Sequence, residues 1–154
     1  LKDFVPGFEK AWLEHSAAFV GIRESRVIVG KYVMTAQDIL EQKPFEDAIA
    51  VAGYPVDIHH AKGGDCTMLF CEDAYQIPYG VLVPQTIKGL LVAGRCSAMD
   101  HEAMAATRVM STCMALGEAA GVAARIAVAD GVEVGDVDIT KVQQALLENG
   151  AYLG

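Results

Sequence analysis

The sequence predicts an α/β fold, and three segments of the chain support that prediction. Residues 111–129 are rich in Ala and Gly and are expected to form one long helix that ends at Gly131. Residues 54–60 alternate in the manner of a strand. Residues 90–94 (LLVAG) are apolar throughout, which is typical of a parallel strand buried on both faces. With 154 residues, the chain is long enough for one domain with a hydrophobic core.

The first 35 residues are expected to contain a helix followed by short extended pieces. Large apolar side chains recur at roughly helical spacing over residues 1–30, namely Phe4, Phe8, Trp12, Leu13 and Phe19. Residues 27–29 form a β-branched run that predicts a short strand before Gly30. Residues 31–35 are expected to form a second short strand or the edge of a loop.

The next segment combines a capped helix with a less defined stretch. Thr35 and Asp38 resemble a capping box, which predicts a short helix that runs to about residue 42. Residues 45–52 are expected to form a helix or an irregular segment.

Several extended segments follow in the middle of the chain. In the expected strand 54–60, Asp57 and His59 share one face because side chains alternate along a strand. Residues 62–65 predict a turn. Two further stretches are expected to be extended, residues 67–70 and 75–83.

The C-terminal end of the chain predicts a further helix. Thr140 and Gln143 form a second capping-box pattern, which would begin this helix. Asn149 and Gly150 are a typical C-terminal stop.

The composition limits the classes of partner. Hydrophobic residues make up 53% of the chain and charged residues 21%, which indicates a globular protein. The net charge of −8 argues against binding to nucleic acid or to an anionic membrane surface. No apolar run in the sequence reaches the length of a bilayer span, so no membrane association is expected.

The cysteine pattern gives no sign of a metal site. Cys66, Cys71, Cys96 and Cys113 form no CxxC pair, and no histidine lies at zinc-finger spacing from them. Reduced thiols in a cytoplasmic protein are the expected state, and a disulfide between Cys66 and Cys71 is left open.

The stretch 90–128 is the most informative part of the sequence for chemistry. It predicts a buried strand, a loop, and a helix of small residues that another backbone or a flat ligand could approach closely. The first turn of such a helix has free N–H groups and the positive end of the helix dipole, which favour an anion or an electron-rich oxygen. A strand followed by an Ala/Gly helix is also common in α/β proteins of other function.

A longer pattern of short motifs extends through residues 75–121. The motifs are YQIPY at 75–79, AGRC at 93–96, HEA at 101–103, RVM at 108–110, TCMALG at 112–117 and AAG at 119–121. Upstream, RESR at 23–26, Gly30, Tyr32 and DIH at 57–59 fit the same pattern. In these motifs the chain resembles bacterial FAD-dependent oxidoreductases of the glutathione-reductase-like flavoprotein superfamily.

This resemblance implies that the chain is a fragment of a two-domain FAD-binding fold. Residues 1–88 would belong to the substrate or cap domain, residues 89–130 to the returning strand and helix of the Rossmann-like FAD domain, and residues 131–154 to a C-terminal helical tail. The family's FAD domain opens with a GxGxxG turn that holds the pyrophosphate, and this sequence contains no such motif. The expected partner is therefore the missing N-terminal portion of the FAD domain.

The resemblance also implies which residues lie beside the flavin. These are Gly94, Arg95, Val109, Met110, Ser111, Thr112 and Cys113.

Four residues are candidates for substrate chemistry. His59, oriented by Asp57, could act as acid or base, and His101 could bind the substrate or donate a proton. Arg23 and Arg26 could hold a substrate carboxylate through bidentate hydrogen bonds. The alternatives are a structural histidine at 59, a loop-capping histidine at 101, and arginines that are solvent-exposed or paired with Glu24.

The expected function is therefore two-electron or hydride transfer between FAD and a small organic substrate, with the fragment inactive on its own. Two alternatives stay open: a non-catalytic interaction domain derived from a flavoprotein, and an iron–sulfur-linked electron carrier. The four cysteines lack the spacing of a cluster-binding motif. A homo-oligomer is also left open.

Overall fold

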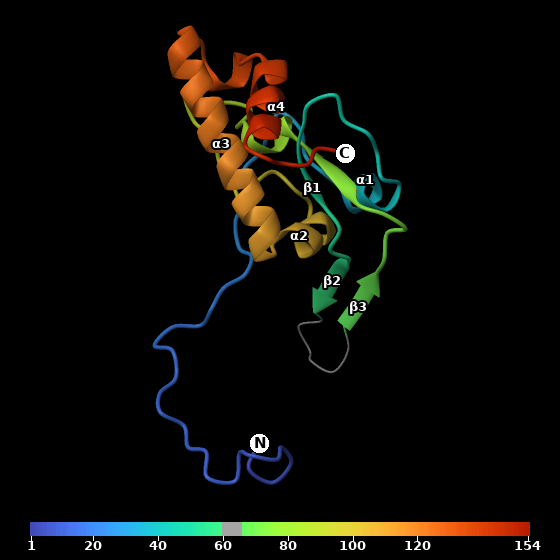
Figure 1. Cartoon of the computed structure of the whole chain (residues 1–154), viewed down its shortest axis with the longest axis vertical. Helices are drawn as coiled ribbons and strands as arrows, with labels where there is room; N and C mark the ends of the chain where they lie inside the picture. Colours follow the sequence, from blue (N-terminus) through green and yellow to red (C-terminus); the bar gives the residue numbers. More distant parts are fainter. Residues whose placement is uncertain (60–65) are drawn as a thin grey trace.

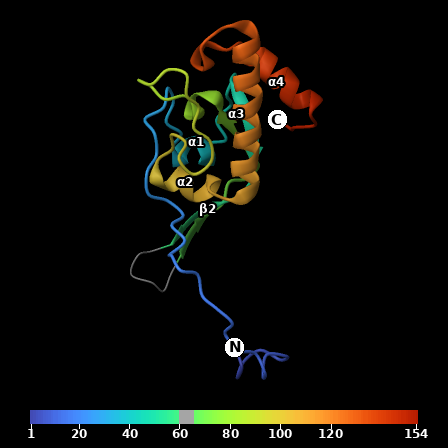
Figure 2. The ribbon, with the colours of Figure 1, turned by 90° about the vertical axis from the view of Figure 1, so that its left-hand side faces the viewer.

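The computed structural model describes residues 1–59 and 66–154, and these residues form a mixed α and β structure. Figures 1 and 2 show a compact body, from which a long N-terminal arm extends away. In the body, helix α3 (Met110–Asp130) runs along one side, with α4 (Ile139–Glu148) packed against it. Strand β1 (Ala48–Ala52) contacts both helices.

The N-terminal arm, residues 1–29, contains no α-helix, so the helix expected there is wrong. Its large apolar side chains are exposed, including Phe4, Trp12 and Phe19. A helix in water is stabilised mainly by packing of its apolar face, and here most of the large apolar side chains stay exposed. The expected strand at 27–29 is also not formed, although the Ile28 N–H donates to the Cys96 carbonyl at 3.0 Å.

The chain enters the body at Gly30, which is the first residue that forms a β-bridge. Gly30 and Pro84 form an isolated antiparallel bridge, and Met34 forms a parallel bridge with Met99. Residues 31–35 are therefore the edge of a loop. A side chain at Gly30 would lie 2.5 Å from the Ala98 Cβ, so this close approach requires glycine.

The capped helix after this loop is confirmed as α1 (Ala36–Leu40). The Thr35 side chain accepts from the Asp38 N–H, and the Asp38 carboxylate accepts from the Thr35 N–H at 2.9 Å. This reciprocal pair is a capping box, which satisfies two backbone donors at the helix start.

The segment 45–52 contains strand β1, which corrects the expected helix or irregular stretch. β1 pairs antiparallel with β4 (Tyr75–Pro78), and residues Ala48, Ile49, Ala50 and Ala52 are buried. Small alanines do not specify a strand locally, and the pairing with a segment about 25 residues later decides the conformation. The expected extended stretch 75–83 is correct only for β4, since a 3₁₀ turn, η1 (Tyr79–Leu82), follows it.

The expected strands at 54–60 and 67–70 are confirmed in their central parts, as the antiparallel hairpin β2 (Val56–His59) and β3 (Cys66–Leu69), whereas residues 54–55 and 70 are not in strands and residue 60 lies outside the described residues. Asp57 and His59 share a face, as their alternation predicts, with 3.1 Å between Asp57 Oδ2 and His59 Nε2. The turn expected at 62–65 lies outside the described residues.

Residues 90–94 are not a buried parallel strand, which corrects a central expectation. They form a half-exposed loop, in which the Val92 N–H donates to the Leu82 carbonyl at 2.9 Å. A parallel strand needs neighbouring strands to pair its backbone, and among the described residues none lies beside this segment.

A short helix that the sequence-based expectation missed, α2 (His101–Thr107), precedes α3 and is capped by Asp100. The long helix itself is confirmed, and it ends at Gly131, whose φ of 68° and ψ of 32° are left-handed. By length and composition α3 could cross a membrane, which differs from the expectation that no segment is long and apolar enough; core helices of water-soluble proteins meet the same criterion. Its buried residues pack against β1, α4 and the 3₁₀ turn η2 (Val134–Asp136).

The last helix, α4, begins at Ile139, whereas the sequence predicted Thr140 as its N-cap. The N-cap of α4 is Asp138, which accepts from the Thr140 N–H, rather than Thr140 itself. This start places Ile139 against the core, together with the fully buried Val142 and Leu146. The helix ends at Glu148, and Asn149 is its C-cap, in the expected place.

Candidate functional site

A pocket of about 310 Å³ lies between the α2–α3 junction, the base of the β2–β3 hairpin and the end of the N-terminal arm. We call it the Arg108 pocket; its walls are formed by Arg23, Tyr54, Asp57, Ala105, Arg108, Val109 and Met110. Two residues proposed from the sequence for substrate chemistry or orientation, Arg23 and Asp57, therefore meet two proposed for the flavin, Val109 and Met110. The fold brings them together from three separate parts of the chain.

A charged network at the edge of this pocket connects the arm to the body. One carboxylate oxygen of Glu24 lies 2.7 Å from His101 Nδ1. The other oxygen accepts a hydrogen bond from Arg108 Nη1 at 3.3 Å. The Arg108 side chain is only 11% exposed, whereas His101 is 66% exposed. Glu24 therefore joins a histidine that is open to solvent to an arginine that is largely buried.

Arg108 also contacts the hairpin. Its Nη2 donates to the Asp57 carbonyl oxygen at 3.0 Å, so one guanidinium joins the arm, the α2–α3 junction and strand β2. The planar guanidinium can make such divergent hydrogen bonds without loss of charge. On the other side of Asp57, its carboxylate lies between His59 Nε2 at 3.1 Å and the Tyr54 hydroxyl at 3.4 Å.

The residues expected to face the flavin surround the start of α3. Val109 is the N-cap residue, and no side chain caps the N–H groups of the first turn. Met110 and Ser111 are exposed, Thr112 is buried and Cys113 is half-buried. Gly94 has a φ of +76°, and a Cβ there would lie 3.8 Å from Cys113, so the loop 90–94 passes directly beside this helix start.

The environment of Cys113 keeps its thiol neutral. Burial raises the pKa of Cys113, and the nearby Arg95 guanidinium only partly opposes this effect. The Sγ atom lies 3.8 Å from the Thr107 carbonyl oxygen, at the end of α2. A neutral thiol is a poor nucleophile, so this position favours packing over covalent chemistry.

The remaining predicted residues lie farther from the pocket. Arg95 is exposed and donates from Nη1 to the Ile22 carbonyl at 3.1 Å, so it anchors the arm. Arg26 is exposed and forms no hydrogen bond or ion pair with any other described residue. Of the two arginines proposed to hold a carboxylate, only Arg23 lines the pocket.

The contact between Glu24 and Arg108 was not predicted from the sequence. Glu24 was expected to pair at most with Arg23 or Arg26, and its partners are instead 77 and 84 residues away in the chain. The motif RVM at 108–110 marks Arg108 as noteworthy, but no spacing rule connects it to residue 24. Only the path of the arm across α2 brings them together.

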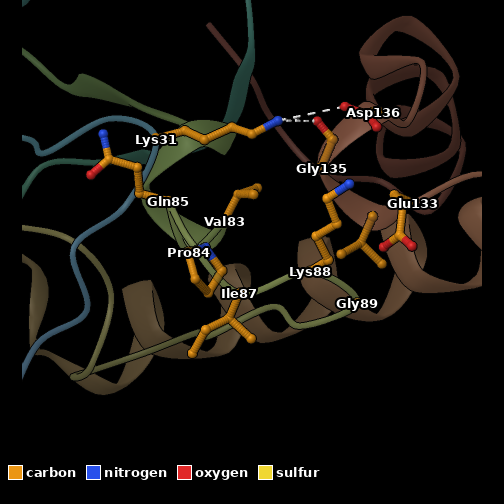
Figure 3. A pocket seen from close by; sticks show the side chains of 11 residues that line it. Lys31, Val83, Pro84, Gln85, Ile87, Lys88, Gly89, Glu133, Gly135 and Asp136 are labelled. Carbon is orange, nitrogen blue, oxygen red and sulfur yellow. Dashed lines mark hydrogen bonds and ion pairs between the residues drawn. The ribbon is translucent and has the colours of Figure 1, made fainter.

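A second, smaller pocket of about 110 Å³ lies elsewhere on the body, between the loop after η1 and the turn η2 (Figure 3). Of its two lysines, Lys31 already has partners within the protein. Its Nζ donates to the Gly135 carbonyl at 2.6 Å and lies 3.7 Å from the Asp136 carboxylate. None of the residues proposed from the sequence lines this pocket. The Arg108 pocket is therefore the candidate site.

The part of the chain that the structure describes holds no group of three His, Cys, Asp or Glu side chains that could bind a metal ion. All four cysteines are free thiols, with Cys66 and Cys96 exposed.

Comparison with known protein families gives a match over most of the chain. The family model of the FAD dependent oxidoreductases matches residues 1–146, which is nearly the whole chain and includes the arm. No curated protein and no solved structure matches the chain. The match extends through every residue of the Arg108 pocket, and the chain therefore belongs to the FAD dependent oxidoreductase family.

Proposed function

We propose that this chain forms the substrate-side wall of a flavoenzyme that transfers a hydride, or two electrons, between FAD and a small organic substrate. One observation supports this proposal above the others. Val109 and Met110 belong both to the uncapped start of α3 and to the Arg108 pocket. A ring placed at the helix start would therefore lie next to a substrate held in the pocket.

The start of α3 suits the isoalloxazine ring of FAD. Its first-turn N–H groups have no side-chain cap, and the positive end of the helix dipole stabilises negative charge such as that of a reduced flavin. Gly94 presents no side chain beside Cys113, which leaves room there for a ligand to approach the helix start. When bound, FAD would supply the hydride acceptor or donor.

The chain's own polar groups would handle protons and orient the substrate. His101 is open to solvent and is held by Glu24, so it can exchange a proton between the pocket edge and water. Asp57 orients His59 in the same way on the hairpin. In both pairs a carboxylate fixes the imidazole ring, as in other acid–base pairs of enzymes.

The ADP half of FAD requires further polypeptide in this proposal. The sequence has no GxGxxG turn, and the two sheets formed by the described residues are antiparallel pairs. A dinucleotide fold needs a parallel sheet whose glycine-rich turn holds the pyrophosphate. We therefore expect the chain alone to be inactive and to contact only the ring portion of the cofactor.

A titration with lumiflavin, the isoalloxazine ring without ribityl phosphate or ADP, tests this function. Backbone amide NMR shifts are expected to change at residues 94–95 and 109–113, and FAD is expected to bind no more tightly than lumiflavin. Absence of shifts at these amides contradicts the proposed ring site. Stoichiometric tight binding of FAD contradicts the claim that the ADP half needs other polypeptide.

Two matched variants sharpen the test, because Met110 and Val128 lie near opposite ends of α3 and are each 84% exposed. Met110→Glu places a carboxylate beside the first-turn N–H groups and is expected to abolish the lumiflavin shifts. Val128→Glu adds the same charge far from the site and is expected to leave them unchanged. Equal effects of the two variants would show that the helix start is not the ring site.

The exposed arm favours one alternative, a non-catalytic interaction domain. Large apolar side chains such as Phe4, Trp12 and Leu13 stand in solvent, which is typical of a surface that contacts another polypeptide. The lumiflavin titration separates the two functions, because an interaction domain has no reason to bind the ring at residues 109–113.

A further inference from the structure

We propose that the Arg108 pocket binds the carboxylate group of the substrate, and that Glu24 occupies this carboxylate position when the pocket is empty. The assignment of the ligand as substrate rests on the proposed function. The binding of a carboxylate does not, because it follows from the contacts of the pocket alone.

The cations of the pocket have unused hydrogen-bonding capacity. Arg108 donates hydrogen bonds to two described residues, from Nη1 to the Glu24 carboxylate and from Nη2 to the Asp57 carbonyl oxygen. A guanidinium has five N–H donors, so further donors remain for a ligand. Arg23 lines the same pocket, is exposed, and forms no hydrogen bond or ion pair with other described residues. Two arginines in one small pocket can therefore both bind a single carboxylate, for which the guanidinium geometry is well suited.

The contacts of Glu24 indicate which group this position accepts. Its two carboxylate oxygens are bound by different donors, His101 Nδ1 at 2.7 Å and Arg108 Nη1 at 3.3 Å. The longer distance, 3.3 Å, lies beyond the usual range for a charge-assisted hydrogen bond, so Glu24 satisfies Arg108 incompletely. A free carboxylate in the pocket can approach Arg108 from the side of Arg23 and replace Glu24 there.

The Asp57 carboxylate also lines the pocket, but its hydrogen-bond partners do not include Arg108. Its carboxylate oxygen Oδ2 is shared between His59 and the Tyr54 hydroxyl, and Arg108 contacts its backbone carbonyl rather than its side chain. The guanidinium of Arg108 therefore has Glu24 as its only carboxylate partner among the described residues.

The experiment titrates the full chain with sodium succinate and follows binding by NMR shifts of the Arg108 side chain and of His101. Sodium chloride at matched ionic strength and succinamide, the neutral analogue, serve as controls. Succinate is expected to shift the Arg108 and His101 signals with saturation, whereas both controls leave them in place. Equal shifts with sodium chloride or succinamide overturn the proposal.

Three variants and one control are expected to affect succinate binding differently. Two variants weaken it, one strengthens it, and the control leaves it unchanged. Arg23→Gln and Arg108→Lys are expected to weaken succinate binding by about tenfold or more, because each removes charge-assisted hydrogen bonds. Glu24→Gln is expected to strengthen it severalfold, since it removes the competing carboxylate and keeps the side-chain shape. Arg125→Gln changes an exposed arginine on α3 outside the pocket and is expected to have no effect.

The Glu24 variant keeps the test decisive even if Arg108→Lys perturbs folding. Unchanged or weaker succinate binding in Glu24→Gln overturns the role of Glu24 as the resident carboxylate. The lumiflavin shifts are measured on the same samples. Succinate binding without lumiflavin shifts refutes the flavin function alone, and lumiflavin shifts without succinate binding refute the carboxylate site alone.

Discussion

At the residue scale, Asp38 shows how several weak contacts control one carboxylate. Its oxygens accept from the Tyr32 hydroxyl, from the Thr35 N–H and from the Thr35 hydroxyl, each at 2.9 Å, and Lys43 Nζ lies 3.3 Å away. Partial burial acts to raise the pKa of Asp38, but these hydrogen bonds outweigh it, and the net pKa lies below the usual value. Because the folded-state pKa is lowered, the carboxylate stabilises the fold above its ordinary pKa, and this contribution is lost as the pH falls through the lowered value.

We therefore expect Asp38→Asn to reduce the free energy of unfolding by about 1 kcal/mol near neutral pH, the typical contribution of a helix-capping residue. The difference from the wild type is expected to shrink at a pH below the lowered pKa, where the wild-type carboxyl is also neutral. Urea unfolding at the two pH values measures both quantities. Asp3→Asn, in the exposed arm, is the control and is expected to change neither. A difference that stays constant with pH would contradict this account.

Single residues also show which parts of the candidate site could be predicted from the sequence. The chemical types of His59, His101 and Arg23 could be recognised from the sequence, and Asp57 could be placed on the same strand face as His59 because strand periodicity is local. Glu24 and Arg108 could not be paired in advance. Their contact spans 84 residues and depends on where the arm crosses α2.

At the scale of elements, Gly117 inside helix α3 and Gly131 at its C-cap differ in backbone conformation. Gly131 ends the helix with a φ of +68°, which strains any residue with a Cβ. Gly117 lies inside the helix, and a methyl group added to its Cα would have no neighbouring atom within 4 Å outside the helix's own backbone. The two positions test whether helix stability follows backbone conformation.

Gly131→Ala is expected to destabilise the fold by about 1 kcal/mol, since alanine in the left-handed region is strained. Gly117→Ala is expected to stabilise it by about 0.5–1 kcal/mol, because alanine favours the helix interior. Urea unfolding of both variants, with circular dichroism as the signal, measures the two changes. Changes of the same sign would show that α3 does not end at Gly131.

Elements were predictable where their signals are local. The Thr35–Asp38 capping box, the long helix that ends at Gly131 and the alternation at 54–60 are all formed as expected. The segments 45–52 and 90–94 were misassigned, because their conformation depends on whether a partner strand lies beside them. β1 has β4 as its partner, and residues 90–94 have none among the described residues.

At the scale of the whole molecule, the N-terminal arm is distinct from the body. It extends away in both views of Figures 1 and 2, and its contacts with the body begin near residues 22–28. The core formed by β1, β4, α2, α3 and α4 includes no residue of the first 27. The part of the arm before residue 22 therefore contributes little to the stability of the body.

Limited trypsin digestion is expected to cleave after Lys2 and Lys10 before it cleaves after Lys31, Lys43, Arg125 or Lys141. Proteases act on accessible, locally unfolded backbone, and the first two sites lie in the exposed arm. Mass spectrometry of early time points identifies the order of cleavage. The trimmed chain is expected to unfold at the same temperature as the intact chain. Cleavage within α3 or α4 at the same early times would show that the arm protects the body.

The sequence by itself determined the mixed α and β character, the capped and glycine-terminated helices, the hairpin strands and the resemblance to FAD-dependent oxidoreductases, which the family match supports. Each of these depends on residues close together in the chain or on a family pattern. The tertiary structure alone decided that the arm stays extended, that residues 90–94 form a loop, and that Glu24, Arg108 and Asp57 meet around one pocket. The physical reason is that these features depend on long-range contacts, whose free energy exceeds the small local preferences of the segments involved.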